Sequence, residues 1–223
     1  MKINLLQKMD FENLALFIHK QLQHLFLEEN ENHLISIQKY IPQSLNRMRV
    51  LVNSVRVWDD NIFDTRQSTQ YCIFLYLLSN TIFKETEKTE LPTLLFLLNK
   101  SLNAIDLFYE IELPEIFFIS HSVGIVFAKA KYSNYFAIYQ NSTVGRNQYG
   151  RPTIEEGVIL YPNSSIIGNS HIQKNTLISS GIHLINQHPP KNCLVLKNAA
   201  GGGGRLLFKP LKNLKHIEEI FKI

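Results

Sequence analysis

The stretch TIEEGVILYPNSSIIGNSHIQKNTLISSGIHL, from Thr153 to Leu184, decides the fold because it repeats every six residues. One position of each repeat is aliphatic: Ile154, Leu160, Ile166, Ile172, Ile178 and Leu184. Three residues later stands a residue that tolerates left-handed backbone: Gly157, Asn163, Asn169, Asn175 and Gly181. Each repeat therefore suits a short strand with an inward aliphatic, followed by a corner. The pattern predicts a parallel β-helix of hexapeptide repeats.

The same phase continues towards the N-terminus with one interruption. Val126, Tyr132, Ile138 and Val144 keep the spacing of six, but ten residues separate Val144 from Ile154. Four extra residues must therefore bulge out within 145–153. An insertion in a regular solenoid is a typical place for a functional site.

The first half of the chain has helical spacing instead. Asp10 is a candidate N-cap for a first helix, and a second is expected within His33–Trp58, interrupted or kinked near Pro42. A third, apolar on most sides, is expected over 70–83, capped by Ser68 or Thr69. A fourth starts around Pro92. We expect His19, His24 and His33 on helix surfaces.

The predicted fold class is therefore α + β, with three parts. Residues 1–110 form a helical domain, and residues 111–200 form the β-helix. Residues 201–223 form a Gly-rich linker, Gly201–Gly204, and a basic C-terminal helix over about 210–221.

Composition excludes several classes of protein. A chain of 223 residues with 45% hydrophobic residues is not disordered. Its apolar runs are far shorter than the roughly 20 residues of a membrane span, so no integral membrane segment is expected. Cys72 and Cys193 lack metal-ligand spacing and suit reduced thiols in a cytoplasmic protein. The basic tail lacks interleaved aromatic residues, which favours a solvated helix face over nucleic-acid binding.

Three strings of sequence resemble a known family. They are Ser120-His121-Ser122-Val123-Gly124-Ile125-Val126, the segment Ile138–Gly145, and Arg151-Pro152-Thr153-Ile154. They resemble the serine acetyltransferases and, more broadly, the hexapeptide-repeat acyltransferases that include capsule and O-antigen sugar O-acetyltransferases. The resemblance covers about residues 105–196, and a helical half before the repeats matches the serine acetyltransferase layout. It implies a left-handed β-helix, a homotrimer or dimer of trimers, and acetyl-CoA bound between neighbouring helices.

The resemblance also implies roles for individual residues. His121 matches the general base that takes the proton of an attacking hydroxyl. The carboxylate that orients it matches either Asp106, by separation, or Glu112, by local context. The backbone N–H of Gly145 would stabilise the oxyanion. The positions that match the family's pantetheine-binding coils are Tyr161, Pro162, Ser179 and Ser180.

Two departures from the family pattern concern the acceptor. Serine acetyltransferases carry Asp where this chain has Ser120, and an Arg-His pair where it has Gly150-Arg151. The loss of these residues argues against L-serine and favours a hydroxyl of a sugar or glycan precursor. Arg151 either binds a phosphate or acidic sugar or forms a salt bridge that holds the loop.

Histidines in the repeats raise the question of a metal. His171 and His183 occupy variable repeat positions and should lie on the surface. His183 and His188 suggest a zinc pair, but no third histidine stands at a suitable offset, so no metal is expected. The leading hypothesis is thus an acetyl-CoA-dependent sugar O-acetyltransferase. Its alternatives are a serine O-acetyltransferase and a non-catalytic hexapeptide-repeat scaffold.

Overall fold

The chain divides into two compact units. The structure, a computed structural model, describes residues 3–5, 10–27, 30–198 and 205–223. One unit comprises residues 1–53 and 57–110, and the other comprises 54–56 and 111–223. We describe each unit by itself.

The first unit is helical, as predicted. Its helices are α1 (Phe11–Phe26), α2 (Glu31–Ser54, whose last residue is grouped with the second unit), α3 (Ser68–Thr86) and α4 (Glu90–Asn103), with a small parallel pair of β1 (Asn4–Leu5) and β2 (Ile62–Phe63). Helix α3 packs on α4 and is buried on nearly all sides, which confirms its predicted central place. Among the described residues, no helix has both the length and the apolar character to cross a bilayer.

Several details of the helices differ from expectation. The Asp10 carboxylate accepts the Asn13 N–H at 2.7 Å, which confirms that cap. Helix α3 is instead capped by Gln67, and α2 runs through Pro42 without interruption. His19 and His33 were expected on the surface but are 2% and 5% exposed. In α1, the buried stripe is wide enough to include Ala15 and His19 beside Leu14, Ile18 and Leu22.

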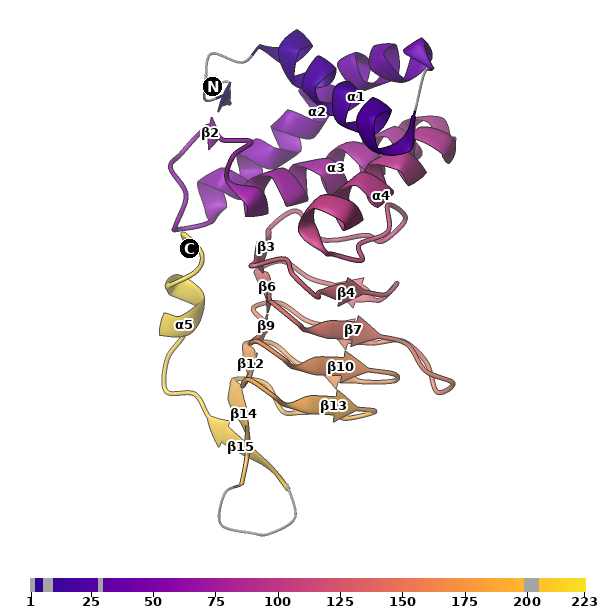
Figure 1. Ribbon diagram of the computed structural model, residues 1–223. Helices are drawn as coiled ribbons and strands as arrows, with labels where there is room; N and C mark the ends of the chain where they lie inside the picture. The colour runs from indigo at the N-terminus through magenta and orange to yellow at the C-terminus, as the bar shows by residue number, and fades with distance from the viewer. Residues whose placement is uncertain (1–2, 6–9, 28–29, 199–204) are drawn as a thin grey trace. The chain divides into compact units, whose positions relative to one another are not determined.

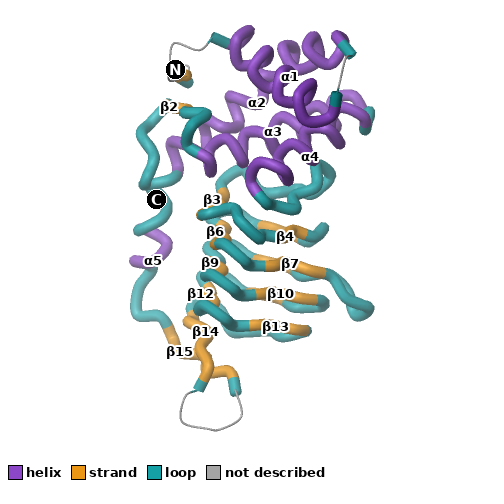
Figure 2. Tube along the Cα trace, in the orientation of Figure 1, coloured by secondary structure: helices purple, strands orange, loops and turns teal. Residues whose placement is uncertain are grey.

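The second unit is a three-sided parallel β-helix (Figures 1 and 2). The first face stacks β3 (Phe117–Ser120), β6 (Phe136–Tyr139), β9 (Ile159–Leu160), β12 (Thr176–Ile178), β14 (Cys193–Lys197) and β15 (Leu206–Pro210). The second face stacks β4 (Val126–Phe127), β7 (Thr143–Gly145), β10 (Ser165–Ile167) and β13 (His183–Ile185). The third face stacks β5 (Lys131–Tyr132), β8 (Thr153–Ile154) and β11 (His171–Ile172).

The repeating aliphatics form the core of these coils. Ile138, Leu160 and Ile178 pair in register on the first face, and Val144, Ile166 and Leu184 pair on the second. Ile154 pairs with Ile172 on the third face, and all these side chains are fully buried. Each contributes roughly 1.5–3 kcal/mol by burial. The six-residue period is thus confirmed as the repeat of the β-helix.

The corners use left-handed backbone at the predicted positions, with one exception. Asn163 (φ 60°), Asn175 (φ 55°), Gly157 and Gly181 all have positive φ. At the remaining corner Gly168 (φ 71°) takes that conformation, and the predicted Asn169 does not. The Asn169 N–H is instead bound by the side chain of Asn186, at 2.9 Å.

The first coil is irregular in a way that the sequence pattern did not indicate. Phe127, not Val126, pairs with Val144, so the assignment of Val126 to the inward phase was wrong. Its side chain is 40% exposed. Upstream, three residues separate Ser120 from Gly124, where one separates the equivalent Tyr139 and Asn141. The first coil therefore carries a bulge of two extra residues at this corner. Between β4 and β5 the same coil has one residue fewer than a regular coil.

The C-terminal segment also differs from expectation. Residues 201–204 lie outside the described part of the chain. After them β15 pairs antiparallel with β14, and α5 (Lys215–Glu218) has four residues instead of spanning 210–221. The segment then runs back along the β-helix (Figure 1), where the Phe221 ring lies 5.5 Å from that of Tyr135. The described tail thus belongs to the second unit.

Candidate functional site

His121 lies in the corner bulge of the first coil. Its backbone has φ 51°, the left-handed conformation that corners of the other coils also adopt. Its side chain is exposed, and within the described residues its ring makes no hydrogen bond or ion pair. The imidazole is therefore open to a ligand instead of being used by the core.

Five predicted site residues line the same edge of the β-helix as His121. Register places Ser120 beside Tyr139, Tyr139 beside Tyr161, and Tyr161 beside Ser179, all facing outward on the first face. Pro162 and Ser180 follow Tyr161 and Ser179 at the corner. Because parallel strands lie about 4.8 Å apart, the edge runs roughly 14 Å from the coil of His121 to that of Ser180.

Two further residues of this edge were not singled out from the sequence. The Tyr139 ring stacks on Tyr161 with centroids 5.4 Å apart. Burial is the main cause that raises the pKa of both phenols, and Glu219 adds to it. Next to Tyr139, the amide oxygen of Gln140 is buried and has no hydrogen-bond partner in the part of the chain that the structure describes. The two tyrosines occupy equivalent positions in consecutive coils, because one regular coil plus the four-residue insertion separates them. Counting the repeat in phase across the insertion could therefore have found this pair.

Neither candidate carboxylate is hydrogen-bonded to the His121 ring. Asp106 forms an ion pair with Lys100 in the helical unit, with Nζ and Oδ2 2.7 Å apart. Glu112 belongs to the same unit as His121 and is exposed in the segment before β3. The structure therefore does not choose between them.

The four-residue insertion forms a hairpin at the other end of the second face. Asn147 and Gly150 exchange backbone hydrogen bonds of 3.1 and 3.2 Å, and Tyr149 at the tip is exposed. Figure 1 shows this loop extending from β7 beyond the neighbouring coils. Gly145 ends β7, where its carbonyl accepts the Gly168 N–H at 2.9 Å, and Arg151 follows the hairpin. Within one chain, Gly145 and Arg151 therefore lie at the end of the second face opposite to the corner of His121, with the length of strand β7 between them.

The comparisons with known proteins bear on the fold. No protein-family model and no curated protein sequence matches the chain. Solved structures do. A serine acetyltransferase from Vibrio cholerae matches with a TM-score of 0.70 at 18% identity, over 92% of this chain and 82% of that one. A serine acetyltransferase from Neisseria gonorrhoeae matches with a TM-score of 0.67 at 17% identity, over 94% and 84%. A serine acetyltransferase in complex with CoA matches at 0.69 and 17%, over 91% and 87%.

The chain has the hexapeptide-repeat fold of the serine acetyltransferases. The likeness spans both the helices and the coils, since it covers more than nine-tenths of the chain. It confirms the fold that the resemblance of the three sequence strings implied.

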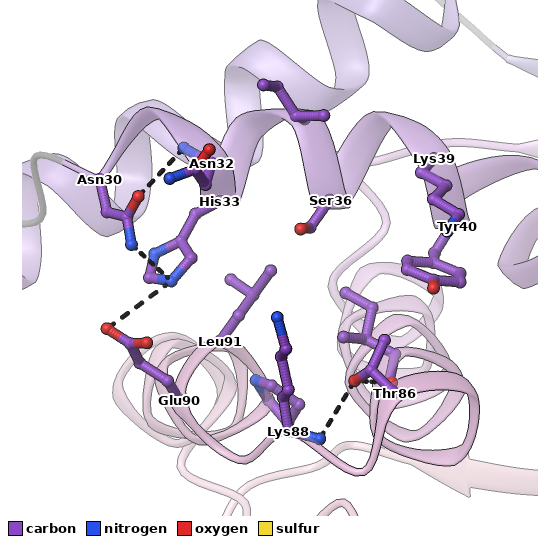
Figure 3. A pocket seen from close by; sticks show the side chains of 13 residues that line it. Asn30, Asn32, His33, Ser36, Lys39, Tyr40, Thr86, Lys88, Glu90 and Leu91 are labelled. Atoms are coloured by element: carbon purple, nitrogen blue, oxygen red, sulfur yellow. Dashed lines mark hydrogen bonds and ion pairs between the residues drawn. The ribbon is translucent and has the colours of Figure 1, made fainter.

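The helical unit of this serine acetyltransferase-like chain contains a separate pocket of about 440 Å³ (Figure 3). His33 lies at one end, with its Nε2 3.4 Å from the Asn30 amide and 3.8 Å from a Glu90 carboxylate oxygen. Lys39 and Lys88 also line it. Because the lining mixes both charges, it indicates no one class of ligand.

The surface histidines of the β-helix have other partners. His171 and His183 are exposed, as predicted. The His171 Nε2 lies 2.7 Å from the Glu155 carboxylate, and the His183 Nδ1 lies 2.9 Å from the Ser165 hydroxyl. Across the described ranges, no three His, Cys, Asp or Glu side chains gather as metal ligands.

Proposed function

We propose that this protein is an O-acetyltransferase that transfers an acetyl group from acetyl-CoA to a hydroxyl of a sugar or glycan precursor. The observation that carries the proposal is the exposed His121 imidazole, placed by the corner bulge at the end of an edge lined by predicted donor-binding residues. The fold, which is similar to that of a serine acetyltransferase in complex with CoA, supports the same donor.

The chain supplies the groups that direct acetyl transfer need. His121 takes the proton of the acceptor hydroxyl while the oxygen attacks the thioester carbonyl, and the proton then goes to the departing thiolate. Such a base contributes about 10²–10⁴-fold in rate. Along the edge, Tyr161, Pro162, Ser179 and Ser180 offer a flat, largely uncharged track for the pantetheine arm.

A homotrimer would complete this site. Gly145 and Arg151 stand at the far corner of the second face from His121, so a neighbouring copy is the simplest way to bring them to the same ligand. The second face also exposes apolar side chains, with Val126 at 40% and Ile185 at 54% exposure, which favours its burial against another chain. The two free, buried cysteines suit the reducing cytoplasm.

The acceptor is the point on which the alternatives differ. Ser120 and Arg151 stand where serine acetyltransferases have residues that hold the amino acid, so we place a sugar before L-serine. A non-catalytic scaffold remains the alternative of another class, but it gives no role to the exposed His121 imidazole.

The decisive experiment compares His121→Ala with His183→Ala, a second exposed histidine on the β-helix. Release of CoA thiol from acetyl-CoA is followed with a panel of sugars and with L-serine. We expect His121→Ala to lose about 10²–10⁴-fold in kcat with a sugar, and His183→Ala to stay near wild type. Unchanged activity of His121→Ala would remove the named base, activity with L-serine alone would favour the second hypothesis, and no activity with any acceptor would favour the scaffold.

A mixing experiment tests the shared site. Trimers assembled from His121→Ala and Arg151→Gln chains together should transfer acetyl to an acidic sugar faster than trimers of either variant alone, because some seams then carry both native residues. Activity no higher than the sum of the separate variants would argue against a site built from two copies.

A further inference from the structure

A basic pocket lies on the third face of the β-helix. Lys129, Lys131, Arg151 and Thr153 line it together with Ala130 and Pro152, and its volume is about 240 Å³. Strands β5 and β8 build it, since Lys131 pairs with Thr153 and the Lys131 N–H donates to the Pro152 carbonyl at 3.1 Å. The inward neighbours Tyr132 and Ile154 point to the core, so Lys131 and Thr153 point outward.

The charges of this pocket are all positive. Lys129, Lys131 and Arg151 are exposed, and no acidic residue is among the lining residues that the structure describes. Lys131 and Arg151 form no ion pair with any described residue. The next outward residue along β8 is Glu155, and its carboxylate is already held by His171 at 2.7 Å and by the Lys174 N–H at 3.1 Å.

This arrangement favours one of the two roles considered for Arg151. A salt bridge that holds the loop needs an acidic partner, and none is present among the described residues. A cationic fork beside a second cation and a hydroxyl is instead typical of a site for an oxyanion, because guanidinium binds phosphate and carboxylate groups in bidentate geometry.

We propose that this pocket binds the anionic group, a phosphate or carboxylate, of an acidic sugar acceptor. The inference rests on the proposed function for the identity of the molecule that carries the group. The pocket is smaller than the roughly 300–1,000 Å³ of sites that enclose a whole small ligand, so it suits one charged group of a larger molecule. It also adjoins the insertion hairpin, the feature that we expect at the seam between copies.

The phosphates of the CoA donor are the other source of the same chemistry. The predicted donor track follows the first face to the corner of His121, whereas the pocket lies at the far corner of the second face. A molecule at the corner of His121 does not reach the pocket of its own chain, whereas the pocket of a neighbouring copy would adjoin both donor and acceptor, so the second test below assigns the source.

The first test measures binding directly. Inorganic phosphate, glucose 1-phosphate, glucuronate and neutral glucose are titrated by calorimetry into the wild type, Lys131→Gln/Arg151→Gln, and the control Lys191→Gln, an exposed lysine of the same β-helix outside the pocket. We expect the anions to bind the wild type and the control, and to bind the double variant at least tenfold more weakly. Arg151→Lys should restore part of the affinity. Equal anion affinity in the double variant and the wild type would overturn the site.

The second test assigns the source and separates this inference from the proposed function. In acetyl transfer, the double variant should lose at least tenfold more kcat/KM with an acidic sugar than with a neutral sugar, and KM for acetyl-CoA should change less than either. A rise in KM for acetyl-CoA that disappears with its 3′-dephospho form would assign the pocket to the donor and overturn the acceptor assignment. Transfer that is unaffected by the double variant would refute the pocket and leave the proposed function standing. Anion binding without transfer to any sugar would refute the proposed function instead.

Discussion

At the scale of single residues, two glycines allow the cost of left-handed backbone to be distinguished from the cost of close packing. Gly157 and Gly181 both have positive φ, 73° and 71°. A Cβ at Gly157 would lie 2.5 Å from the Asn175 amide oxygen and 2.9 Å from Ile217 Cδ1. A Cβ at Gly181 would meet no described atom within 4 Å. The two corners therefore make the same conformational demand in different surroundings.

The pair gives a prediction for stability. Gly181→Ala should cost about 1–2 kcal/mol, the strain of left-handed backbone alone. Gly157→Ala should cost about 1–3 kcal/mol more, because the methyl group also overpacks its corner. Denaturant unfolding of both variants measures the difference. Gly181→Asn is the control and should lie closer to wild type, since Asn141 and Asn163 adopt the same conformation at equivalent corners. Equal costs at the two glycines would contradict the packing argument.

The candidate base shows where residue-level prediction from sequence ends. The resemblance pointed to His121, but the six-residue count did not place it in a bulge. Counting backwards from Val144 assigns the phase to Val126, because the loss of one residue between Phe127 and Tyr132 is invisible in a strict period. Only the strand register, with Phe127 opposite Val144, reveals the shift.

At the scale of elements, Glu155 joins two coils of the third face. It follows β8, and its carboxylate binds the His171 side chain of β11 and the Lys174 N–H. The hydrogen bond from His171 is the largest cause that lowers the pKa of Glu155 below its usual value of 4.5, and the Lys174 N–H adds to it. The ionised carboxylate is thus stabilised in the folded chain.

This link predicts a pH-dependent effect of Glu155→Gln. The pKa of Glu155 is lower in the folded chain than in the unfolded chain. The stabilisation is therefore fully present above the usual pKa of a glutamate, and it is lost as the pH falls through the pKa of the folded chain. We expect the variant to melt lower than wild type at pH 7 by at most about 2 °C, since the pair is exposed to solvent. The difference should vanish near pH 3. A constant difference across this range would show that lost packing, and not the charge, is its cause.

Elements with a strong internal period were predictable, and the C-terminal segment was not. The stacked strands bury residues that the chain marks by a spacing of six, and helix α3 buries the unbroken run Gln70–Ile82, which is largely apolar. The basic stretch after Arg205 contains Leu211, Leu214 and Ile217 at spacings that also suit a helix. Pairing with β14 fixes Leu206–Pro210 as a strand, and docking of Ile217 against Gly157 helps to fix the segment beyond it. Those constraints come from residues distant in sequence, so local spacing does not contain them.

At the scale of the whole molecule, the two units each contain one buried thiol. Cys72 lies in α3 of the helical unit, and Cys193 lies in β14 of the β-helix. Burial raises the pKa of Cys193, and its thiol donates to the Pro190 carbonyl at 2.9 Å. Disulfide reagents react with the thiolate, and both thiols are buried in the folded chain. Each cysteine therefore reacts, and reports, when its own unit opens.

The last prediction uses this pair to ask how the units unfold. In Cys193→Ser the remaining thiol reports the helical unit, and in Cys72→Ala it reports the β-helix. Without denaturant we expect each thiol to react with an aromatic disulfide at least ~100-fold more slowly than in the unfolded chain. Across a guanidinium series the two thiols should become reactive at different midpoints, because each unit has a core of its own and opens with its own free energy. Circular dichroism of each variant checks that it folds as the wild type does. A single midpoint shared by both thiols would show that the chain unfolds as one cooperative body.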